Sequence, residues 1–143
     1  MHDAPPLGSL LIVDDDEEIR SALRHVLEDE GWTVQVAADG EAALDALRAR
    51  PGEIALVLID LLMPRLGGAG FLKRKAVEPA LAAVPVIVVS AIPDMTPIPD
   101  TPDLRAVLRK PVSIAALVEA VRLAAAVPSG PDRSVPVDVD PRR

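Results

Sequence analysis

Short apolar stretches recur along the chain and alternate with longer amphipathic ones. Each apolar stretch is rich in Val, Ile, Leu or Ala and has the length of a single strand that is buried on both faces. We therefore predict strands at residues 10–13, 33–37, 54–59, 86–89 and 106–108.

The segments between these strands show apolar residues at helical spacing. The first predicted helix has acidic residues in its first turn and Gly31 beyond its end, and its inward face is Ile19, Ala22, Leu23, Val26 and Leu27. A second helix begins at Asp39 and Gly40, with inward residues Ala43, Leu44 and Leu47. Residues 67–78 predict a third helix. Ser113 is the expected N-cap of a last one, with Ile114, Leu117, Val118 and Val121 inward.

Strands that alternate with helices predict right-handed βαβ units, and hence an α/β fold with a doubly wound, buried parallel sheet. The segment between the fourth and fifth strands departs from this pattern. It carries prolines at positions 93, 97, 99 and 102, and proline removes an amide donor and constrains the preceding residue. The helix expected there is therefore degenerate or missing.

The 143 residues suit one domain. We expect a flexible N-terminus at 1–8, one domain at 9–127, and a disordered Pro-rich tail at 128–143. With a net charge of −7 and no basic patch, the chain is not expected to contact nucleic acid directly. The absence of cysteine excludes disulfides and thiolate zinc sites. Neither a secretion signal nor a membrane-spanning stretch is evident, so a cytoplasmic location is expected.

Polar side chains follow four of the predicted strands: Asp14 and Asp15, then Asp60, Ser90 and Lys110. The carboxyl ends of parallel strands meet at one edge of a sheet, which places these groups together. Two carboxylates 4 Å apart repel by about 4 kcal/mol at an effective dielectric of 20 unless a cation lies between them. Oxygen ligands favour Mg²⁺, or Mn²⁺, over zinc. A carboxylate beside such a cation can attack a phosphoryl group, so phosphoryl acceptance is the predicted chemistry.

Five segments carry a resemblance to a known family: residues 11–20, Asp39-Gly40, residues 56–64 with Gly68, residues 86–91, and Lys110-Pro111. Together they resemble the receiver domain of bacterial two-component response regulators, over about residues 9–127. The resemblance implies a flavodoxin-like five-stranded parallel sheet with strand order 2-1-3-4-5. It also implies a phosphoprotein rather than an enzyme acting on a separate substrate. Because only 17 residues follow the last predicted helix, we expect a stand-alone receiver of the single-domain type.

The resemblance further implies a role for each site residue. Asp60 would accept a phosphoryl group from a sensor histidine kinase or a phosphotransfer protein. Mg²⁺ would be held by Asp15, by Asp14 mainly through water, by Asp60 and by the backbone carbonyl of Leu62. Ser90 would move to hydrogen-bond the phosphoryl oxygens, and Lys110 would pair with them. Signalling would proceed by phosphorylation-dependent binding of a downstream protein or by phosphorelay, and a homodimer is one possible assembly.

Two departures from the family pattern concern the output of the signal. Val107 occupies a position that is usually aromatic in the family, and the Pro-rich residues 92–102 replace a helix. We expect the signal to leave through the loop at 90–102 or through the last helix. Two alternative functions stay open at this point: a phosphatase of the haloacid-dehalogenase type, and a receiver-like module that binds a partner without being phosphorylated.

Overall fold

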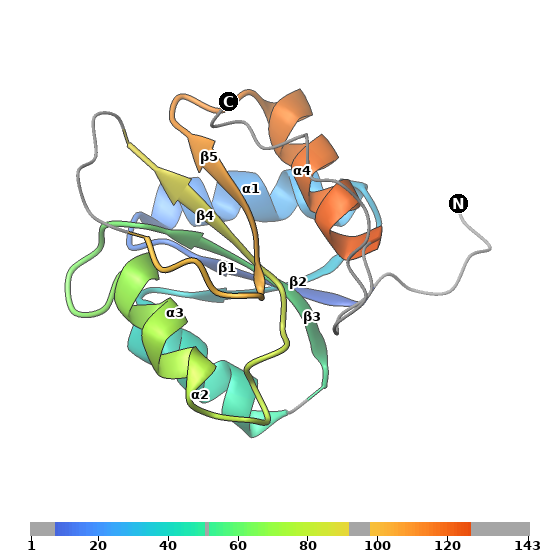
Figure 1. Cartoon of the computed structure of the whole chain (residues 1–143). Coiled ribbons are helices and arrows are strands. Elements are labelled where there is room, and N and C mark those ends of the chain that lie inside the picture. The colour runs from blue at the N-terminus through green and yellow to red at the C-terminus, as the bar shows by residue number, and fades with distance from the viewer. Residues whose placement is uncertain (1–7, 51, 92–97, 127–143) are drawn as a thin grey trace.

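The computed structural model describes residues 8–50, 52–91 and 98–126. Its centre is a parallel sheet of five strands: β1 (Ser9–Val13), β2 (Thr33–Ala37), β3 (Ile54–Asp60), β4 (Val86–Ser90) and β5 (Leu104–Arg109). The strands lie in the order β2-β1-β3-β4-β5 (Figure 1). This order and the parallel pairing confirm the predicted fold class.

The helices cover both faces of this sheet. They are α1 (Glu17–Asp29), α2 (Gly40–Ala49), α3 (Gly68–Ala76) and α4 (Ile114–Ala126). Helices α1 and α4 lie on one face, and α2 and α3 lie on the other (Figure 1). Because all strand pairs are parallel, the carboxyl ends of the strands lie at one edge of the sheet. The connections from β1 to α1, from β3 to α3 and from β5 to α4 start at this edge.

The apolar patterns located all five strands, with small errors at their ends. Asp60 and Ser90 are the last residues of β3 and β4 instead of the residues after them, and β5 is longer than predicted at both ends. Helix α3 is shorter than the predicted 67–78, because its regular turns end at Ala76, before Glu78 and Pro79.

Capping residues set the helix starts as the sequence indicates. The carboxylate of Asp16 accepts hydrogen bonds from the backbone N–H groups of Glu18 and Ile19 at 2.9 and 3.3 Å. Asp39 caps α2 through the N–H of Ala42 at 2.9 Å, and Ser113 caps α4 through that of Ala116 at 3.0 Å. These bonds satisfy amide donors that have no partner within the helix.

The inward faces were predicted correctly along most of each helix but not at two helix starts. Leu27, Leu117 and Val121 are buried as expected. Ile19 and Ile114 are instead 37% and 51% exposed, and Ala22 is also exposed. A periodic pattern defines which face of a helix is apolar, but not how far along the helix that face is covered.

The connection between β4 and β5 contains no helix in the part that the structure describes, which is Ala91 and residues 98–103. Ile98 packs against the core on the α2/α3 face of the sheet, and the backbone carbonyl of Asp103 accepts a hydrogen bond from Val86 at 2.9 Å. Residues 92–97 lie outside the described part, as do the predicted tail at 128–143 and residues 1–7 of the predicted flexible N-terminus.

Aliphatic side chains form the core on both faces of the sheet. The two aromatic residues of the chain, Trp32 and Phe71, are buried, and so is Val107. An ion pair lies within this interior: Lys75 of α3 bonds Asp103 at 2.5 Å, and neither side chain is more than 2% exposed. Burial lowers the pKa of Lys75, and the bond to Asp103 opposes that effect.

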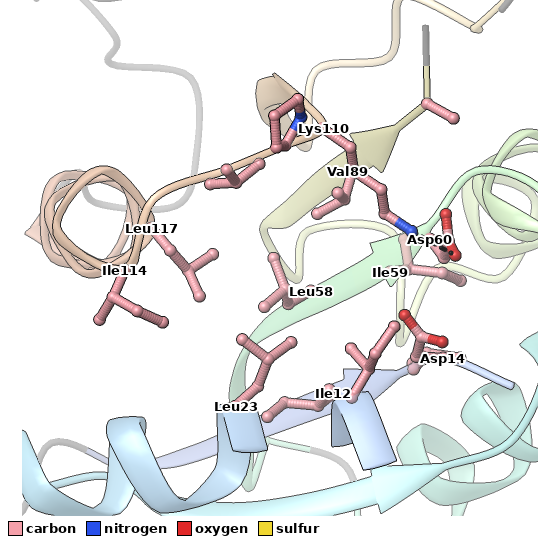
Figure 2. Close-up of a pocket in the computed structure, with 15 residues that line it drawn as sticks. Ile12, Asp14, Leu23, Leu58, Ile59, Asp60, Val89, Lys110, Ile114 and Leu117 are labelled. Carbon is pink, nitrogen blue, oxygen red and sulfur yellow. Dashed lines mark hydrogen bonds and ion pairs between the residues drawn. The ribbon is translucent and has the colours of Figure 1, made fainter. Parts of the chain in front are cut away.

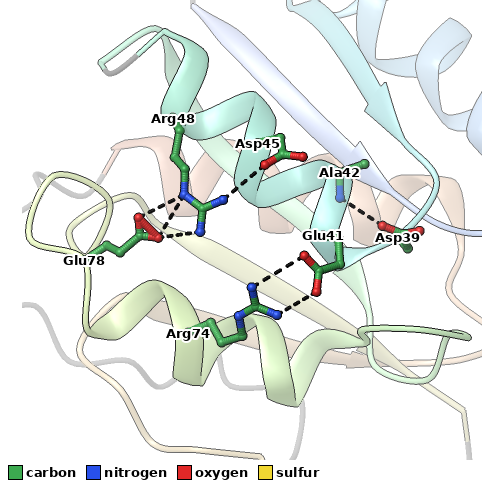
Figure 3. Close-up of polar contacts among 7 residues, drawn as sticks. All are labelled: Asp39, Glu41, Ala42, Asp45, Arg48, Arg74 and Glu78. Atoms are coloured by element: carbon green, nitrogen blue, oxygen red, sulfur yellow. Dashed lines mark hydrogen bonds and ion pairs between the residues drawn. The ribbon is translucent and has the colours of Figure 1, made fainter.

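Exposed ion pairs link α2 to α3 and to Glu78, which follows α3 (Figure 3). Arg48 contacts Glu78 at 2.7 Å and Asp45 at 3.1 Å, and Arg74 contacts Glu41 at 2.7 Å. The hydrogen bond from Arg48 lowers the pKa of Glu78. Such exposed pairs contribute little to stability.

Candidate functional site

Three carboxylates meet where β1 and β3 end. Asp14 follows β1 and is buried, Asp60 ends β3 and is half-buried, and Asp15 is exposed. Each offers an oxygen, and these oxygens lie within 4.8 Å of one another. The structure thus brings together the three acids that the strand-end argument singled out.

The β1–α1 connection holds Asp14 in place. The backbone N–H of Asp16 donates to the Asp14 carboxylate at 2.9 Å, and the Arg20 guanidinium donates to the Asp14 carbonyl at 2.7 Å. The Asp14 N–H donates to Ala37 of β2 at 3.2 Å. Sequence reasoning missed this role of Arg20, although its place one turn into α1 puts it within reach of the end of β1.

The cluster is electrostatically unfavourable without a cation. Burial raises the pKa of Asp14 above its usual 3.8, and the nearby Asp60 and Asp15 raise it further. The hydrogen bond from Asp16 and the charge of Lys110 lower it and compensate only in part. A divalent cation among the three carboxylates would remove this repulsion.

Lys110 supplies a positive charge from the far side of the cluster. Its ammonium group donates to Asp60 Oδ2 at 3.2 Å (Figure 2). Its backbone N–H donates to the Ser90 carbonyl at 2.8 Å, which fixes the residue at the edge of the sheet, and its peptide bond to Pro111 is cis.

Ser90 lies at the same edge but points elsewhere. It is buried, and its hydroxyl donates to the carbonyl of Ala91 at 3.1 Å. Val89, and not Ser90, is the register partner of Asp60 on β4. Ser90 therefore lies at the same edge of the sheet as the acids, but its hydroxyl points to the connection that follows β4.

Leu62 lies in the turn that follows β3. Its side chain is 57% exposed, and its carbonyl accepts no hydrogen bond from any residue within 8–50, 52–91 or 98–126. Two backbone hydrogen bonds hold this turn. The N–H of Leu61 donates to the Val89 carbonyl at 2.8 Å, and the N–H of Gly68 donates to the Leu61 carbonyl at 2.9 Å. The Leu62 carbonyl is thus a hard oxygen donor, two residues after Asp60, that has no partner among the described residues.

Gly67 allows this turn to close. A Cβ built on it would lie 2.3 Å from the Leu61 carbonyl oxygen, well inside contact distance. We expect Gly67→Ala to destabilise the protein by about 1–3 kcal/mol, because the backbone beside Asp60 must shift. Urea denaturation measures this change.

Gly70→Ala is the matched control for that substitution. Its Cβ would meet only the end of the Leu66 side chain, which can rotate, and the residue lies within α3, where alanine is favoured over glycine. Equal losses of stability in the two variants would show that the turn is not sterically closed at Gly67.

An apolar groove of about 580 Å³ adjoins the acidic cluster on the α1/α4 face of the sheet (Figure 2). Asp14, Asp60 and Lys110 line its polar end. The rest is lined by apolar residues of β1, β3, β4, α1 and α4 and of the connections that follow β4 and β5. Sequence analysis missed this groove. The only signal for it was the apolar character of Ile19 and Ile114, which we assigned to the core.

The residues present fit a magnesium site by their chemistry. Three carboxylates and a carbonyl are hard oxygen donors, and a partly exposed position leaves room for water ligands, which Mg²⁺ retains. An ammonium group opposite the cluster can neutralise a phosphoryl oxygen. This edge of the sheet therefore has the parts needed to receive a phosphoryl group on a carboxylate.

A parallel sheet of order 2-1-3-4-5 with this acidic edge defines a receiver-type α/β domain. The family model of the response regulator receiver domain matches residues 10–122, and the chain belongs to that family. Among solved structures it is similar to a response regulator receiver domain protein from Clostridium thermocellum, with a TM-score of 0.70 and 26% identity, covering 82% of this chain and 94% of that one. It is also similar to the receiver domain of the hybrid histidine kinase CckA, with a TM-score of 0.67 and 30% identity, covering 82% and 99%.

Curated relatives include response regulators longer than the matched region. The chain is 46% identical to the transcriptional regulatory protein CpxR of Escherichia coli over 67 residues, which are 47% of this chain and 28% of CpxR. It is 35% identical to the response regulator RR06 of Streptococcus pneumoniae over 116 residues, 80% of this chain and 51% of RR06. The chain thus matches about half or less of these relatives.

Membership in the family identifies the domain as a signalling domain of two-component systems and not an ordinary enzyme. Receiver domains interact with histidine kinases and with downstream effectors, and they bind Mg²⁺ in an acidic pocket. Within the described residues, no helix is long and apolar enough to cross a membrane.

Proposed function

We propose that Asp60 accepts a phosphoryl group from a phosphohistidine of a sensor histidine kinase or phosphotransfer protein. The observation that carries this proposal is the cluster of Asp14, Asp15 and Asp60 with the Lys110 ammonium 3.2 Å from Asp60. A carboxylate oxygen of Asp60 forms a bond to phosphorus as the bond from phosphorus to the imidazole nitrogen breaks, and the electron pair returns to the histidine.

The metal ligands in this proposal are Asp15, Asp60 and the Leu62 carbonyl, with Asp14 acting mainly through water. Bound Mg²⁺ would neutralise charge on the phosphoryl oxygens. Asp14 is held for this purpose by the Asp16 N–H and by Arg20. Mn²⁺ is the other hard cation that this ligand set accommodates.

Ser90 and Lys110 stabilise the product. Lys110 already contacts Asp60, so it can pair with a phosphoryl oxygen by a small movement. Ser90 must first release the Ala91 carbonyl and turn toward Asp60. That exchange of partners pulls on the start of the β4–β5 connection, and we propose that it is the first step of the switch.

The altered connection after β4, or α4, then carries the signal to a downstream protein or to the next phosphoacceptor. Val107 is buried in the core and is aliphatic, so it does not offer the aromatic side chain that the family usually has at this position. Amide hydrogen exchange with and without a phosphoryl mimic tests this route. Unchanged protection in both residues 90–102 and α4 would contradict it.

Incubation of the full chain with Mg²⁺ and acetyl phosphate, followed by intact mass measurement, tests the phosphoacceptor function. We expect a gain of one phosphoryl group, located at Asp60 by fragmentation and lost when the metal is chelated. Absence of an adduct with any donor would favour the binding-only module. Continuous turnover of a phosphoester without an adduct on Asp60 would favour the phosphatase.

A further inference from the structure

Arg20 joins the start of α1 to the end of β1. Its guanidinium donates from Nη1 to the backbone carbonyl of Asp14 at 2.7 Å. Side chains on an α-helix lean toward the N-terminus of the helix, so Arg20, one turn into α1, can reach back across that turn. A hydrogen bond from a charged donor is stronger than one between neutral groups. Arg20 therefore restrains the peptide group that joins Asp14 to Asp15.

Asp14 is held at its other polar groups by backbone atoms. Its N–H donates to the Ala37 carbonyl at 3.2 Å, and its carboxylate accepts from the Asp16 N–H at 2.9 Å. Both of these partners belong to the main chain. The contact from Arg20 comes from a side chain, so a substitution at position 20 removes it and leaves the other two in place.

Asp15 has no such support of its own. The residue is exposed, and within the parts of the chain that the structure describes its carboxylate has no hydrogen bond or ion pair. One of its oxygens nevertheless lies within 4.8 Å of oxygens of Asp14 and Asp60. The direction of this side chain thus depends on the backbone that carries it. The peptide group before Asp15 is the one that Arg20 restrains.

Divalent cations differ in how closely a ligand must be placed. Mg²⁺ needs a near-ideal octahedron with ligand oxygens at about 2.0–2.1 Å, whereas Ca²⁺ accepts about 6–8 oxygens at about 2.3–2.6 Å in a flexible arrangement. A carboxylate on a loose backbone can still serve Ca²⁺, but it meets the demands of Mg²⁺ less often. A residue that fixes the position of Asp15 should therefore favour the smaller cation.

We propose that Arg20 is a positioning residue that makes the acidic site selective for Mg²⁺ over larger cations such as Ca²⁺. The inference rests on the metal ligands of the proposed function, Asp15, Asp60 and the Leu62 carbonyl, and adds the residue that sets their selectivity. Arg20 acts through the peptide group between Asp14 and Asp15 and does not contact the cation.

The positive charge of Arg20 acts in the opposite direction from its hydrogen bond. The charge repels any cation at the site, so removing it alone would strengthen metal binding. Mg²⁺ and Ca²⁺ carry the same charge, and this repulsion changes both affinities nearly equally. The ratio of the two affinities therefore isolates the effect of position from the effect of charge.

Calorimetric titration of the full chain with MgCl₂ and with CaCl₂ gives the two dissociation constants. Arg20→Met removes the hydrogen bond and the charge, and Arg20→Lys keeps the charge and one donor. Arg24→Met is the matched control, because it removes the same charge from an exposed pair with Glu28 one turn further along α1. Loss of a residue that orients a metal ligand typically weakens metal binding by about 10–100-fold.

We expect the Mg²⁺ dissociation constant to rise about tenfold in Arg20→Met, and that for Ca²⁺ to change much less. Arg20→Lys should recover part of the wild-type ratio, and Arg24→Met should retain all of it. Phosphorylation by acetyl phosphate gives a second readout. The half-saturating Mg²⁺ concentration should rise in Arg20→Met, while the rate at saturating Mg²⁺ stays close to that of the wild-type chain.

Urea denaturation in chelator establishes that each variant is folded before it is titrated. Should Arg20→Met be unfolded, the ratio in Arg20→Lys decides the question, and a wild-type ratio there would contradict the inference. An unchanged ratio in a folded Arg20→Met, or an equal change in Arg24→Met, would overturn the role of Arg20 and leave the metal site as proposed. Failure of the wild-type chain to bind Mg²⁺ would instead overturn the proposed metal site.

Discussion

Asp60→Asn is expected to abolish the phosphoryl adduct and, in buffer free of divalent cations, to make the protein more stable. Asparagine keeps the size of the side chain and an oxygen that can accept the hydrogen bond from Lys110. It lacks the charged oxygen that attacks phosphorus, so the adduct should fall below detection by intact mass. Asp45→Asn, at an exposed pair with Arg48, changes the charge equally and should leave the adduct intact.

The gain in stability follows from the repulsion within the acidic cluster. Asp60 is one of the groups that raise the pKa of Asp14, after burial itself. Removing one of three adjacent carboxylates relieves that repulsion, and we expect about 1 kcal/mol from it in urea denaturation. The change from an ion pair to a neutral hydrogen bond with Lys110 subtracts little, because the Lys110 side chain is 37% exposed.

The stability gained in Asp60→Asn should depend on pH in a definite direction. Because the pKa of Asp14 is raised in the folded state, the native protein holds a proton that the unfolded chain releases, and stability falls as the pH rises above the usual 3.8 through the raised pKa. The advantage of Asp60→Asn should therefore grow from acidic to neutral pH and vanish when the acids are protonated. A variant less stable than wild type at neutral pH without metal would show that the cluster is not repulsive.

The strands and helix starts could be predicted from the sequence because their strongest signals are local, whereas the strand order came from the family resemblance. A buried parallel strand must be aliphatic on both faces, so residues 54–59 and 86–89 could be located without any partner. Caps such as Asp16 and Asp39 act within one helical turn. The gathering of Asp14, Asp15 and Asp60 followed from topology alone, because parallel strands end at one edge.

Features that depend on tertiary packing could not be predicted in this way. The direction of the Ser90 hydroxyl depends on a rotamer and a loop carbonyl, and the exposure of Ile114 depends on how far the groove extends between two helices. The clearest case is Lys75, which follows Lys73 and Arg74 in a run that indicates a solvated face. Its burial results from contact with Asp103, 28 residues away in sequence.

Lys75→Met is expected to have the largest effect on stability in this molecule. The Lys75 ammonium bonds the Asp103 carboxylate at 2.5 Å and the Ala82 carbonyl at 3.0 Å, and the residue is 0% exposed. Methionine fills the same space but leaves the Asp103 carboxylate buried without a cation. Breaking a buried pair in this way costs about 3–5 kcal/mol, a large share of the 5–15 kcal/mol that stabilise a typical domain.

Urea denaturation of three further variants separates the buried charge from general effects on α3. Arg74→Met breaks the neighbouring exposed pair with Glu41 and should cost less than about 1 kcal/mol. Asp103→Asn should be destabilised as well, because Lys75 then lacks its counter-charge. Lys75→Met with Asp103→Leu removes both charges and should recover most of the loss. A loss confined to the single variants would show that the unpaired buried charge, and not the loss of the pair itself, destabilises them. A loss in Lys75→Met no larger than in Arg74→Met would contradict this cost of an unpaired charge.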